Sequence, residues 1–325
     1  MYSITVDSDN NSYMSYNNAI YTKNGQTLIA GTSNSANSIL DTTKTIVAGA
    51  FCEMGLSSVT IPNNVVVIED SAFSYNNIKT LALPSSVQTI EGYAFAGNPI
   101  TSLSVNSANP NYMSSNNLIY TKNGQTLVIG TKNGANNMLS TTKTIFEGAF
   151  SGINLTSVTI PNGVVTIGSW AFGDNQLTSL TLPSSVTTIE ESAFYYNRLS
   201  SLTIPNGVVT IGSWAFGDNQ LTSVTLPSSV TTIEDSAFYN NQLTTLNIPN
   251  GIVTIGSWAF ADNNLTQVTL PNSITYIHSY AFAYNSIPQG SLTIDRASGT
   301  VNIGSGAFYY NGYSGGTTII PVYLR

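Results

Sequence analysis

Charge is the scarcest property of this 325-residue chain. Only 8% of its residues are charged, and nine Lys and Arg residues face 16 Asp and Glu residues, which gives a net charge of −7. Binding to nucleic acid or to an anionic membrane surface depends on clustered cations. Because the basic residues here are few and scattered, we expect neither nucleic acid nor an anionic membrane as a partner.

Reactive and metal-binding side chains are almost as scarce. The single cysteine, Cys52, excludes a disulfide framework, and we expect a buried thiol. The single histidine, His278, stands at a position that Glu190, Glu234 or Gly212 fills elsewhere, which indicates a surface substitution. No GxSxG, HExxH or P-loop motif occurs. The sequence therefore predicts a protein that is not an enzyme, with no cofactor and no metal site.

Adjacent carboxylates are the nearest approach to acid–base chemistry, at Glu69-Asp70, Glu190-Glu191 and Glu234-Asp235. Neighbouring residues in an extended chain point apart, so we interpret these pairs as solvating an edge. The segment Asp7–Asn11 could supply oxygen ligands to Ca²⁺. Its copy at Asn106–Pro110 lacks both carboxylates, which leaves calcium as a minor alternative.

No stretch of the chain is long and uniformly apolar enough to span a membrane, so we expect no membrane insertion. The N-terminus, MYSITVDSDNN, has neither a basic nor an apolar region of the kind that opens a secretion signal. Residues Tyr2–Val6 match Thr101–Val105 when the chain is shifted by 99 positions. The sequence thus opens partway into a repeat, and we expect a fragment of a longer protein.

Against these absences, the dipeptide Ala-Phe recurs every 22 residues in two runs. Its phenylalanines are Phe51, Phe73 and Phe95, followed by Phe150, Phe172, Phe194, Phe216, Phe238, Phe260 and Phe282. Self-similarity at this period indicates a solenoid, because one such unit is too short to bury its own apolar face and must stack on neighbours. A solenoid grows by addition, so we predict one domain over residues 1–325.

A typical unit, LTSVTLPSSVTTIEDSAFYNNQ, covers residues 221–242. Val224 and Leu226 fall on one side of a strand, and Ser223 and Thr225 fall on the other. The proline that follows lacks the N–H that a strand ladder needs, so it marks where the chain leaves the sheet. A second inward-facing segment then ends in Ala-Phe. We interpret the apolar positions of both segments as the core.

An asparagine stands three residues after each phenylalanine, at Asn76, Asn98, Asn175, Asn197, Asn219, Asn241, Asn263, Asn285 and Asn311. A short amide at a fixed corner can bond the backbone of its own turn and of the next coil. We interpret the column as structural.

These columns resemble the leucine-rich repeats of the BspA-like family, also called the Treponema pallidum type, whose units carry LxxLxLPxxLxxIxxxAFxxN. The resemblance covers nearly the whole chain. It implies a leucine-rich repeat fold and, for function, a surface or secreted protein of bacteria or some protozoa that adheres to host proteins or other cells. The implied localisation is the cell surface or the extracellular space.

We predict a mainly β, right-handed solenoid of about eleven coils, with two inserted hairpins and an atypical C-terminal coil and cap over about 283–325. Residues 13–51 match 112–150, and each copy carries extra length before its Ala-Phe. Within the copies, apolar segments flank Asn24-Gly25 and Asn123-Gly124, which is the pattern of a type I′ hairpin. The insertions, at about 10–45 and 109–144, are either binding elements or decoration.

The residue two positions before the phenylalanine alternates between large and small side chains. It is Trp170, Ser192, Trp214, Ser236, Trp258 and then Tyr280, with Tyr93 in the earlier run. The sequence leaves open whether these rings share the side of the phenylalanine or turn outward at a bend. An outward row could stack on sugar rings, whereas the alternative is that each indole packs over the serine of the adjacent coil.

Two more columns are candidate binding surfaces. Tyr195, Tyr196 and Tyr239 follow the phenylalanine, either as binding residues or as half-buried turn residues. The strand face, which we expect to be concave, is uncharged at Ser179, Thr181, Ser201, Thr203, Ser223, Thr225, Thr245 and Asn247. These side chains could hydrogen-bond a polypeptide or a glycan, although threonine is also simply a good strand former.

The leading hypothesis is therefore a non-catalytic surface protein that binds a protein ligand on a host or another cell and mediates adhesion. A glycan-binding module that uses the Trp and Tyr rows is the alternative, and a spacer that displays another domain is a third. Solvent exposure of Trp170, Trp214 and Trp258 separates the first two hypotheses.

Overall fold

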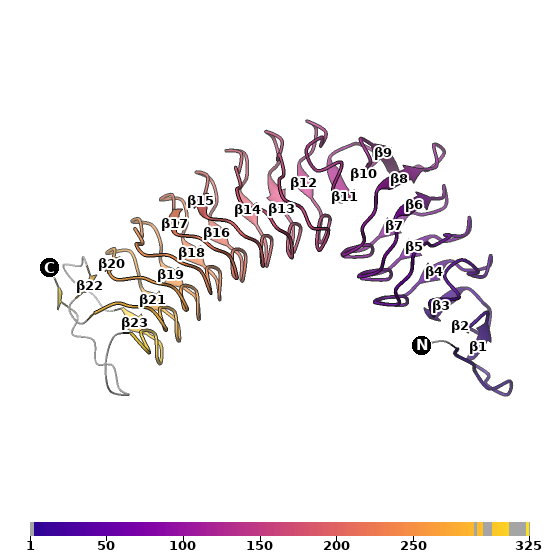
Figure 1. The fold of residues 1–325 in the computed structure, drawn as a ribbon, viewed down its shortest axis with the longest axis horizontal. Coiled ribbons are helices and arrows are strands. Elements are labelled where there is room, and N and C mark those ends of the chain that lie inside the picture. The colour runs from indigo at the N-terminus through magenta and orange to yellow at the C-terminus, as the bar shows by residue number, and fades with distance from the viewer. Residues whose placement is uncertain (1–2, 289–290, 295–300, 312–322, 325) are drawn as a thin grey trace. The chain divides into compact units, whose positions relative to one another are not determined.

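The computed structural model describes residues 3–288, 291–294, 301–311 and 323–324 (Figure 1). These residues form short strands, bends and turns, with no helix among them. The chain winds into a β-solenoid of about 12 turns, close to the expected number. The predicted fold class is thus confirmed, while the handedness stays a prediction.

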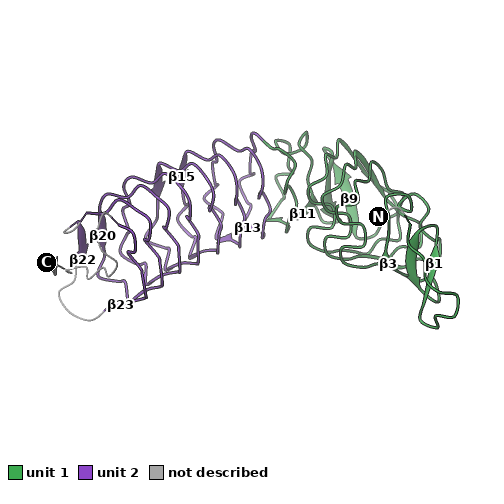
Figure 2. Cartoon of the chain, turned by 60° about the horizontal axis from the view of Figure 1, so that its bottom comes forward, with its two compact units in different colours: residues 1–155 green, residues 156–325 purple. Residues whose placement is uncertain are grey.

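The chain divides into two compact units, residues 1–155 and 156–325 (Figure 2). We call them unit 1 and unit 2. The C-terminal cap expected over about 283–325 lies partly outside the described residues. A single domain over the whole chain stays a prediction.

Unit 1 contains two antiparallel insertions set among parallel strands. Its strands are β1 (Tyr13–Tyr16), β2 (Ala19–Thr22), β3 (Thr27–Ala30), β4 (Thr45–Ile46), β5 (Val67–Ile68), β6 (Thr80–Leu83), β7 (Thr89–Ile90), β8 (Ser102–Val105), β9 (Tyr112–Ser115), β10 (Leu118–Thr121), β11 (Thr126–Ile129) and β12 (Thr144–Ile145). β1 to β5 and β7 form one sheet, β6 pairs with β8, and β9 to β12 are neighbours in order.

Unit 2 repeats one coil without interruption. Its strands are β13 (Thr166–Ile167), β14 (Thr188–Ile189), β15 (Ser201–Thr203), β16 (Thr210–Ile211), β17 (Ser223–Thr225), β18 (Thr232–Ile233), β19 (Thr254–Ile255), β20 (Val268–Leu270), β21 (Tyr276–Ile277), β22 (Leu292–Ile294), β23 (Asn302–Ile303) and β24 (Tyr323–Leu324). The two-residue strands after the prolines pair in parallel and in register, Thr on Thr and Ile on Ile. The strands before the prolines form separate sheets, β15-β17 and β20-β22-β24.

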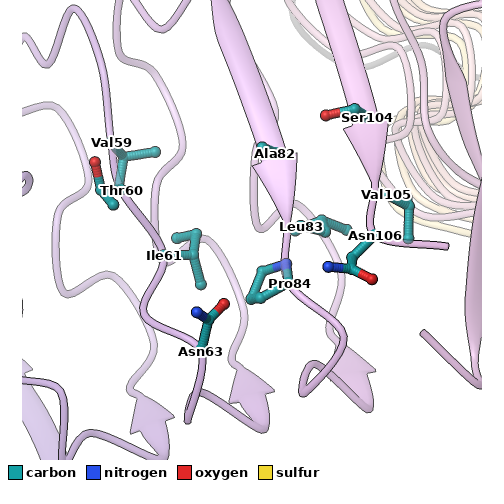
Figure 3. Close-up of a pocket in the computed structure, with 10 residues that line it drawn as sticks. All are labelled: Val59, Thr60, Ile61, Asn63, Ala82, Leu83, Pro84, Ser104, Val105 and Asn106. Carbon is teal, nitrogen blue, oxygen red and sulfur yellow. The ribbon is translucent and has the colours of Figure 1, made fainter. Parts of the chain in front are cut away.

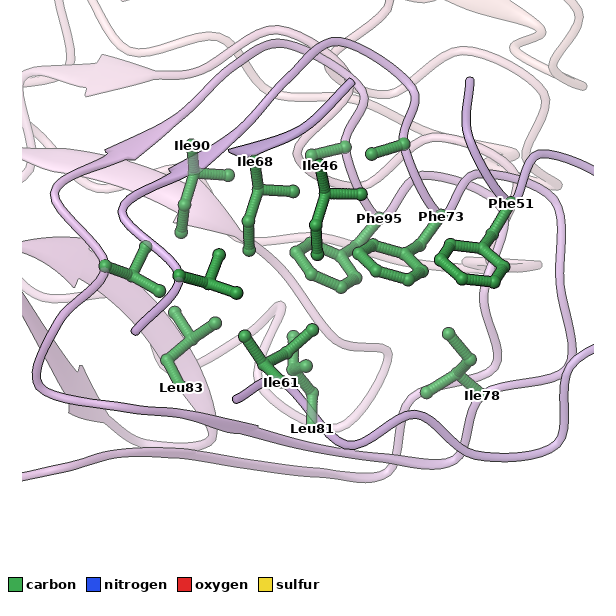
Figure 4. Close-up of a cluster of buried hydrophobic side chains, with 14 of the residues drawn as sticks. Ile46, Phe51, Ile61, Ile68, Phe73, Ile78, Leu81, Leu83, Ile90 and Phe95 are labelled. Atoms are coloured by element: carbon green, nitrogen blue, oxygen red, sulfur yellow. The ribbon is translucent and has the colours of Figure 1, made fainter. Parts of the chain in front are cut away.

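The core is a column of stacked phenylalanine rings with an isoleucine column beside it. In unit 1, Phe51, Phe73 and Phe95 stack with centroids 5.2 Å apart and planes within 11° (Figure 4). In unit 2, neighbouring rings from Phe172 to Phe308 lie 5.2–5.6 Å apart. Because each ring is covered by the next coil, the apolar surface of one coil is buried only by its neighbours.

The asparagine column ties adjacent coils together through the backbone. Asn219 is buried, and its Nδ2 donates to the carbonyls of Phe194, Phe216 and Gly217 at 3.0–3.2 Å. Its Oδ1 accepts the N–H of Leu199 at 3.1 Å. The structural interpretation is therefore confirmed, but the coil that the amide reaches is the preceding one, not the next one.

Each insertion is a three-stranded antiparallel meander joined to the solenoid by its last strand. β1 pairs with β2, and β2 pairs with β3, which then pairs in parallel with β4. The second insertion repeats this arrangement with β9 to β12. We call residues 10–51 the first module and residues 109–150 the second module.

The hairpins across Asn24-Gly25 and its copy are confirmed, but their predicted turn type is wrong. A type I′ turn needs two central residues with positive φ, and here only Gly25 has one, at 69°. The pair that meets the requirement is Asn17-Asn18, with φ of 44° and 59°, between β1 and β2. Its copy, Asn116-Asn117, does the same between β9 and β10.

Candidate binding surfaces

Each corner that carries a phenylalanine has a repeated left-handed backbone. The residues two before and two after the phenylalanine have positive φ, for example 53° at both Trp170 and Asp174. The conformation costs an L-residue about 1 kcal/mol or more, and glycine takes it freely. Glycine does occupy the position at Gly49, Gly148 and Gly306, but most coils place a side chain there. This bend, which the alternation of side chains does not reveal, sets the direction of the indoles.

The three indoles are half-buried and fold over their own corners. A β-carbon at Gly173 would lie 2.6 Å from Cε3 of Trp170, and one at Gly217 would lie 3.0 Å from Cε3 of Trp214. In the alternate coils the residue after the phenylalanine is Tyr195 or Tyr239 instead of glycine. Consecutive corners from Trp170 to Trp258 therefore hold one large ring each, placed alternately before and after the phenylalanine.

The structure brings the tryptophan and tyrosine candidates together in one row. Ring centroids are 5.2 Å apart for Trp170–Tyr195, 5.5 Å for Tyr195–Trp214, 5.3 Å for Trp214–Tyr239, 6.2 Å for Tyr239–Trp258 and 4.7 Å for Trp258–Tyr280. The first four contacts are edge-on, a favourable geometry for aromatic pairs. We call this row the aromatic corner. Ser192 and Ser236 are buried, as the packing alternative predicts for small residues next to the indoles.

Two tyrosines of the aromatic corner are bonded to carboxylates one coil further on. The hydroxyl of Tyr195 donates to Asp218, and that of Tyr239 donates to Asp262. Burial, followed by the bond to the carboxylate and its charge, raises the pKa of each phenol to about 12. Two other members of the tyrosine column are open to solvent, Tyr196 at 59% and Tyr310 at 65%.

Tyr93, the remaining sequence candidate, lies in unit 1 and is half-buried. Its Cδ1 would be 2.6 Å from a β-carbon at Gly148. Cys52 also lies at a unit 1 corner and is half-buried rather than buried, with its sulfur accepting a bond from the Ser74 hydroxyl at 3.2 Å. It is therefore less enclosed than its small neighbours in the sequence suggest.

The carboxylate column caps backbone groups of adjacent coils. Oε2 of Glu190 accepts the N–H of Ser169 at 3.1 Å, and Oε2 of Glu234 accepts that of Ser213 at 3.0 Å. These acids therefore do more than solvate an edge, because they pair donors that the left-handed corner leaves free. In the described part of the chain, no group of three His, Cys, Asp or Glu side chains could hold a metal ion.

The segments before the prolines present their polar side chains to solvent, and we call this side the first-strand face. In each of the six coils from Thr156 to Thr269 it offers three exposed side chains, at the first, second and fourth positions of the segment. All of them are Ser, Thr, Asn or Gln. The eight candidates from Ser179 to Asn247 are among them and are all exposed. The proposed concavity stays a prediction.

In unit 1 the same face has a hollow of about 430 Å³ (Figure 3). Its floor includes Ala82 and Pro84, and Asn63 and Asn106 lie on either side of the proline. Ala82 stands where every coil of unit 2 from Thr159 to Thr269 has Thr or Asn, and the missing side chain leaves space. The lining has no charged residue. The sequence analysis missed this site, which the substitution of alanine in a hydroxyl column could have indicated.

Within the described residues there is no helix of the length and apolar character needed to cross a membrane.

Comparison with protein families matches the chain to the BspA type leucine-rich repeat region over residues 25–138, 130–242 and 187–314. A solved leucine-rich repeat protein from Eubacterium ventriosum is similar at 22% identity and a TM-score of 0.56, over 89% of this chain and 82% of that one. The pneumococcal vaccine antigen PcpA is similar at 20% identity and a TM-score of 0.50, over 79% and 67%. At these identities the likeness shows the fold alone. Comparison with curated proteins gives no match.

Proposed function

The chain belongs to the BspA-type leucine-rich repeat family, and from this premise we propose that it is a non-catalytic scaffold that binds a protein ligand and mediates adhesion at the cell surface or outside the cell. The observation that carries the proposal is the first-strand face of unit 2, which is exposed, regular and free of charge over six coils. The family is often found at the cell surface, which supports the location.

The chemistry of this face suits a polypeptide. Hydroxyl and amide groups both donate and accept hydrogen bonds, as the backbone of an extended chain does. No buried ion pair has to be desolvated when such a partner binds. Equivalent positions repeat from coil to coil, for example Ser201 and Thr203 beside Ser223 and Thr225, so the contacts are individually weak and their sum depends on the number of coils engaged.

The hollow in unit 1 supplies what the flat face of unit 2 lacks. An apolar floor at Ala82 and Pro84 fits an aliphatic or aromatic side chain, the usual anchor of a protein interface. Asn63 and Asn106 can bond the backbone on either side of that anchor. The ligand that this surface favours is therefore an uncharged segment with one large apolar residue.

A displayed library of random peptides, selected on the wild-type protein, tests the proposal. Peptides selected in this way should bind the double variant Thr203→Arg/Thr225→Arg at least about tenfold more weakly, because two charges enter the face. The matched control is Thr187→Arg/Thr231→Arg, on the segment after the proline, which should bind as the wild type does. Between about 50 and 300 mM salt the affinity should change little. Equal binding by the face variant and the wild type would contradict the proposal.

Glycan binding is the second candidate, because Tyr196 and Tyr310 expose their rings at the end of the aromatic corner. Tyr196 contacts Tyr195 at 6.1 Å, so a sugar stacked on it would extend the row. An array of neutral oligosaccharides probes this candidate directly. Sugar binding that is lost in Tyr196→Ala and kept in Thr203→Arg/Thr225→Arg would replace the protein ligand with a glycan.

A further inference from the structure

Neighbouring coils of the solenoid are joined by a set of backbone bonds that all point the same way. Trp170, Phe172 and Asp174 donate their N–H groups to the carbonyls of Glu191, Ala193 and Tyr195 in the following coil at 2.9–3.0 Å. The same three bonds recur at every junction from coil 172 to coil 308. A stack built in this way has free carbonyls at its first coil and free N–H groups at its last coil.

The second module shows how a coil docks on a module within this chain. Tyr93 and Gly97 donate to the carbonyls of Glu147 and Ser151 at 3.4 and 2.8 Å. The middle carbonyl, that of Ala149, is taken instead by the N–H of Gly130 at 2.7 Å. Two corner bonds are therefore made between the preceding coil and the module.

Side chains at the start of the second module complete that junction. Nδ2 of Asn109 donates to the carbonyls of Pro84 and Val87 at 2.9 and 3.0 Å. The hydroxyl of Tyr112 accepts the N–H of Ile90 at 2.9 Å. Both side chains are buried, and Tyr112 is only 7% exposed.

The first module has the same internal geometry. Oδ1 of Asn10 accepts the N–H groups of Ser12 and Tyr13 at 2.9 and 2.8 Å, where Oδ1 of Asn109 accepts two N–H groups at 2.8 Å. Lys23 donates to the carbonyl of Asn10 at 2.9 Å, and Lys122 does so to Asn109 at 2.8 Å. The groups that dock a coil in the second module are thus already in place in the first.

In the first module these docking groups have no partner among the described residues. Nδ2 of Asn10 and the hydroxyl of Tyr13 bond nothing, and Tyr13 is 42% exposed. The carbonyl of Ala50 is occupied by the N–H of Gly31 at 2.8 Å, as in the second module. The carbonyls of Ala48 and Cys52, which correspond to those of Glu147 and Ser151, stay without a donor in the described part of the chain.

The complementary groups lie at the last described coil. The N–H groups of Gly306 and Tyr310 correspond to those of Tyr93 and Gly97, and neither has an acceptor within the described residues. Ile303, in the end strand β23, corresponds to Ile90, five residues before its phenylalanine, and is 44% exposed. One chain therefore carries both halves of a junction that it also makes internally.

We propose that this protein associates head to tail, with the coil 301–311 of one copy docked on the first module of a second copy. Gly306 and Tyr310 then donate to the carbonyls of Ala48 and Cys52, and the N–H of Ile303 reaches the hydroxyl of Tyr13. Because the two patches differ, each docked copy leaves one free patch of each kind, and the assembly grows beyond a dimer as the concentration rises.

Sedimentation velocity of the full chain over a concentration series tests the proposal. Wild-type protein should show oligomers whose size increases with concentration. Tyr13→Lys and Ile303→Lys should each lower the association constant at least about tenfold, because a cation enters an uncharged junction. The control Tyr276→Lys replaces a tyrosine that is 49% exposed between the two ends, and it should associate as the wild type does. Circular dichroism establishes that all three variants are folded.

A mixture of the two end variants gives the sharpest outcome. Tyr13→Lys keeps an intact last coil, and Ile303→Lys keeps an intact first module, so an equimolar mixture should form a dimer that neither variant forms alone. Wild-type protein that stays monomeric at about 1 mM, which corresponds to an interaction weaker than about 4 kcal/mol, would overturn the proposal. So would a mixture that stays monomeric, since that result indicates a symmetric contact.

Discussion

The two modules of unit 1 have nearly the same sequence and different surroundings. In both, a tyrosine is fully buried inside the meander, Tyr21 in the first and Tyr120 in the second, and its hydroxyl accepts a backbone N–H at 3.3 and 3.0 Å. At the docking surface they differ, because Tyr13 is 42% exposed and Tyr112 is 7% exposed. The comparison indicates that a module forms its own core, and that a preceding coil adds burial and bonds without changing its shape.

A regular coil sets the scale for this comparison. Phe216 lies between Phe194 at 5.4 Å and Phe238 at 5.6 Å, and it is fully buried. Replacing it by alanine opens a cavity that no other core can fill, so we expect a loss of about 3 to 5 kcal/mol in the free energy of unfolding. Urea denaturation followed by circular dichroism measures the loss. A loss below about 1 kcal/mol would contradict the stacked core.

Two glycines test whether both modules contact the solenoid in the same way. A β-carbon at Gly31 would lie 1.8 Å from Phe51, and one at Gly130 would lie 2.2 Å from Phe150. Gly31→Ala and Gly130→Ala should each cost about 1 to 3 kcal/mol, because the ring must move within a packed core. Denaturation curves of the two variants should shift equally. A large shift for Gly130→Ala alone would show that the first module is not packed on its coil.

The docking asparagines should separate the modules. Asn109→Ala removes two bonds to the turn at Pro84 and Val87 together with the local turn bonds, and we expect a cost of about 1 to 3 kcal/mol. Asn10→Ala removes the local bonds alone and should cost about 1 kcal/mol less than Asn109→Ala. The measurement is the difference in unfolding free energy at a concentration where the protein is monomeric. Equal costs would mean that the covering coil contributes nothing through this residue.

Removal of a hydroxyl sharpens the same contrast. Tyr112→Phe leaves the N–H of Ile90 without its acceptor in a buried site, so we expect a loss of about 1 kcal/mol. Tyr13→Phe should leave the stability of the monomer within about 0.5 kcal/mol of the wild type, because its hydroxyl bonds nothing in the described chain. Thermal unfolding of the matched pair checks both expectations.

Alkaline pH should weaken both the modules and the aromatic corner. Burial, opposed in part by a backbone bond, raises the pKa of Tyr21 and Tyr120 above 10, and that of Tyr195 and Tyr239 rises to about 12. The folded state then holds protons that the unfolded state releases, so this stabilisation is complete below pH 10 and is lost as pH rises toward about 12. The unfolding free energy should fall over that range, and Tyr195→Phe/Tyr239→Phe should make the fall smaller. A curve of the same slope in this variant would contradict the assignment.

The columns of the repeat could be predicted from the sequence, because burial in a solenoid follows a fixed period. Val224, Leu226 and Phe238 are inside, and Ser223 and Thr225 are outside, as their spacing indicates. The period also identifies a structural asparagine. It does not say whether Asn219 reaches the preceding or the following coil, because both choices repeat every 22 residues.

Turn chemistry and corner geometry were harder to predict. Asn24-Gly25 has the usual type I′ composition, yet that turn occurs at Asn17-Asn18, which two consecutive asparagines with positive φ make possible. The indole of Trp214 could not be oriented, because a left-handed tryptophan is rare and composition does not announce it. The hollow at Ala82 depends on a missing side chain, and the role of the candidate binding residues stays a prediction.

Amide hydrogen exchange on the intact chain, followed by mass spectrometry of peptides from both modules, tests most directly whether the two modules are one structure in two settings. Amides of β2–β3 and β10–β11 should be protected to the same degree, while residues 10–13 should exchange faster than residues 109–112. The difference at 10–13 should shrink as protein concentration rises and copies dock. Exchange of β2–β3 at the rate of an unfolded chain, with β10–β11 protected, would contradict the account, because the module would then need its neighbour in order to fold.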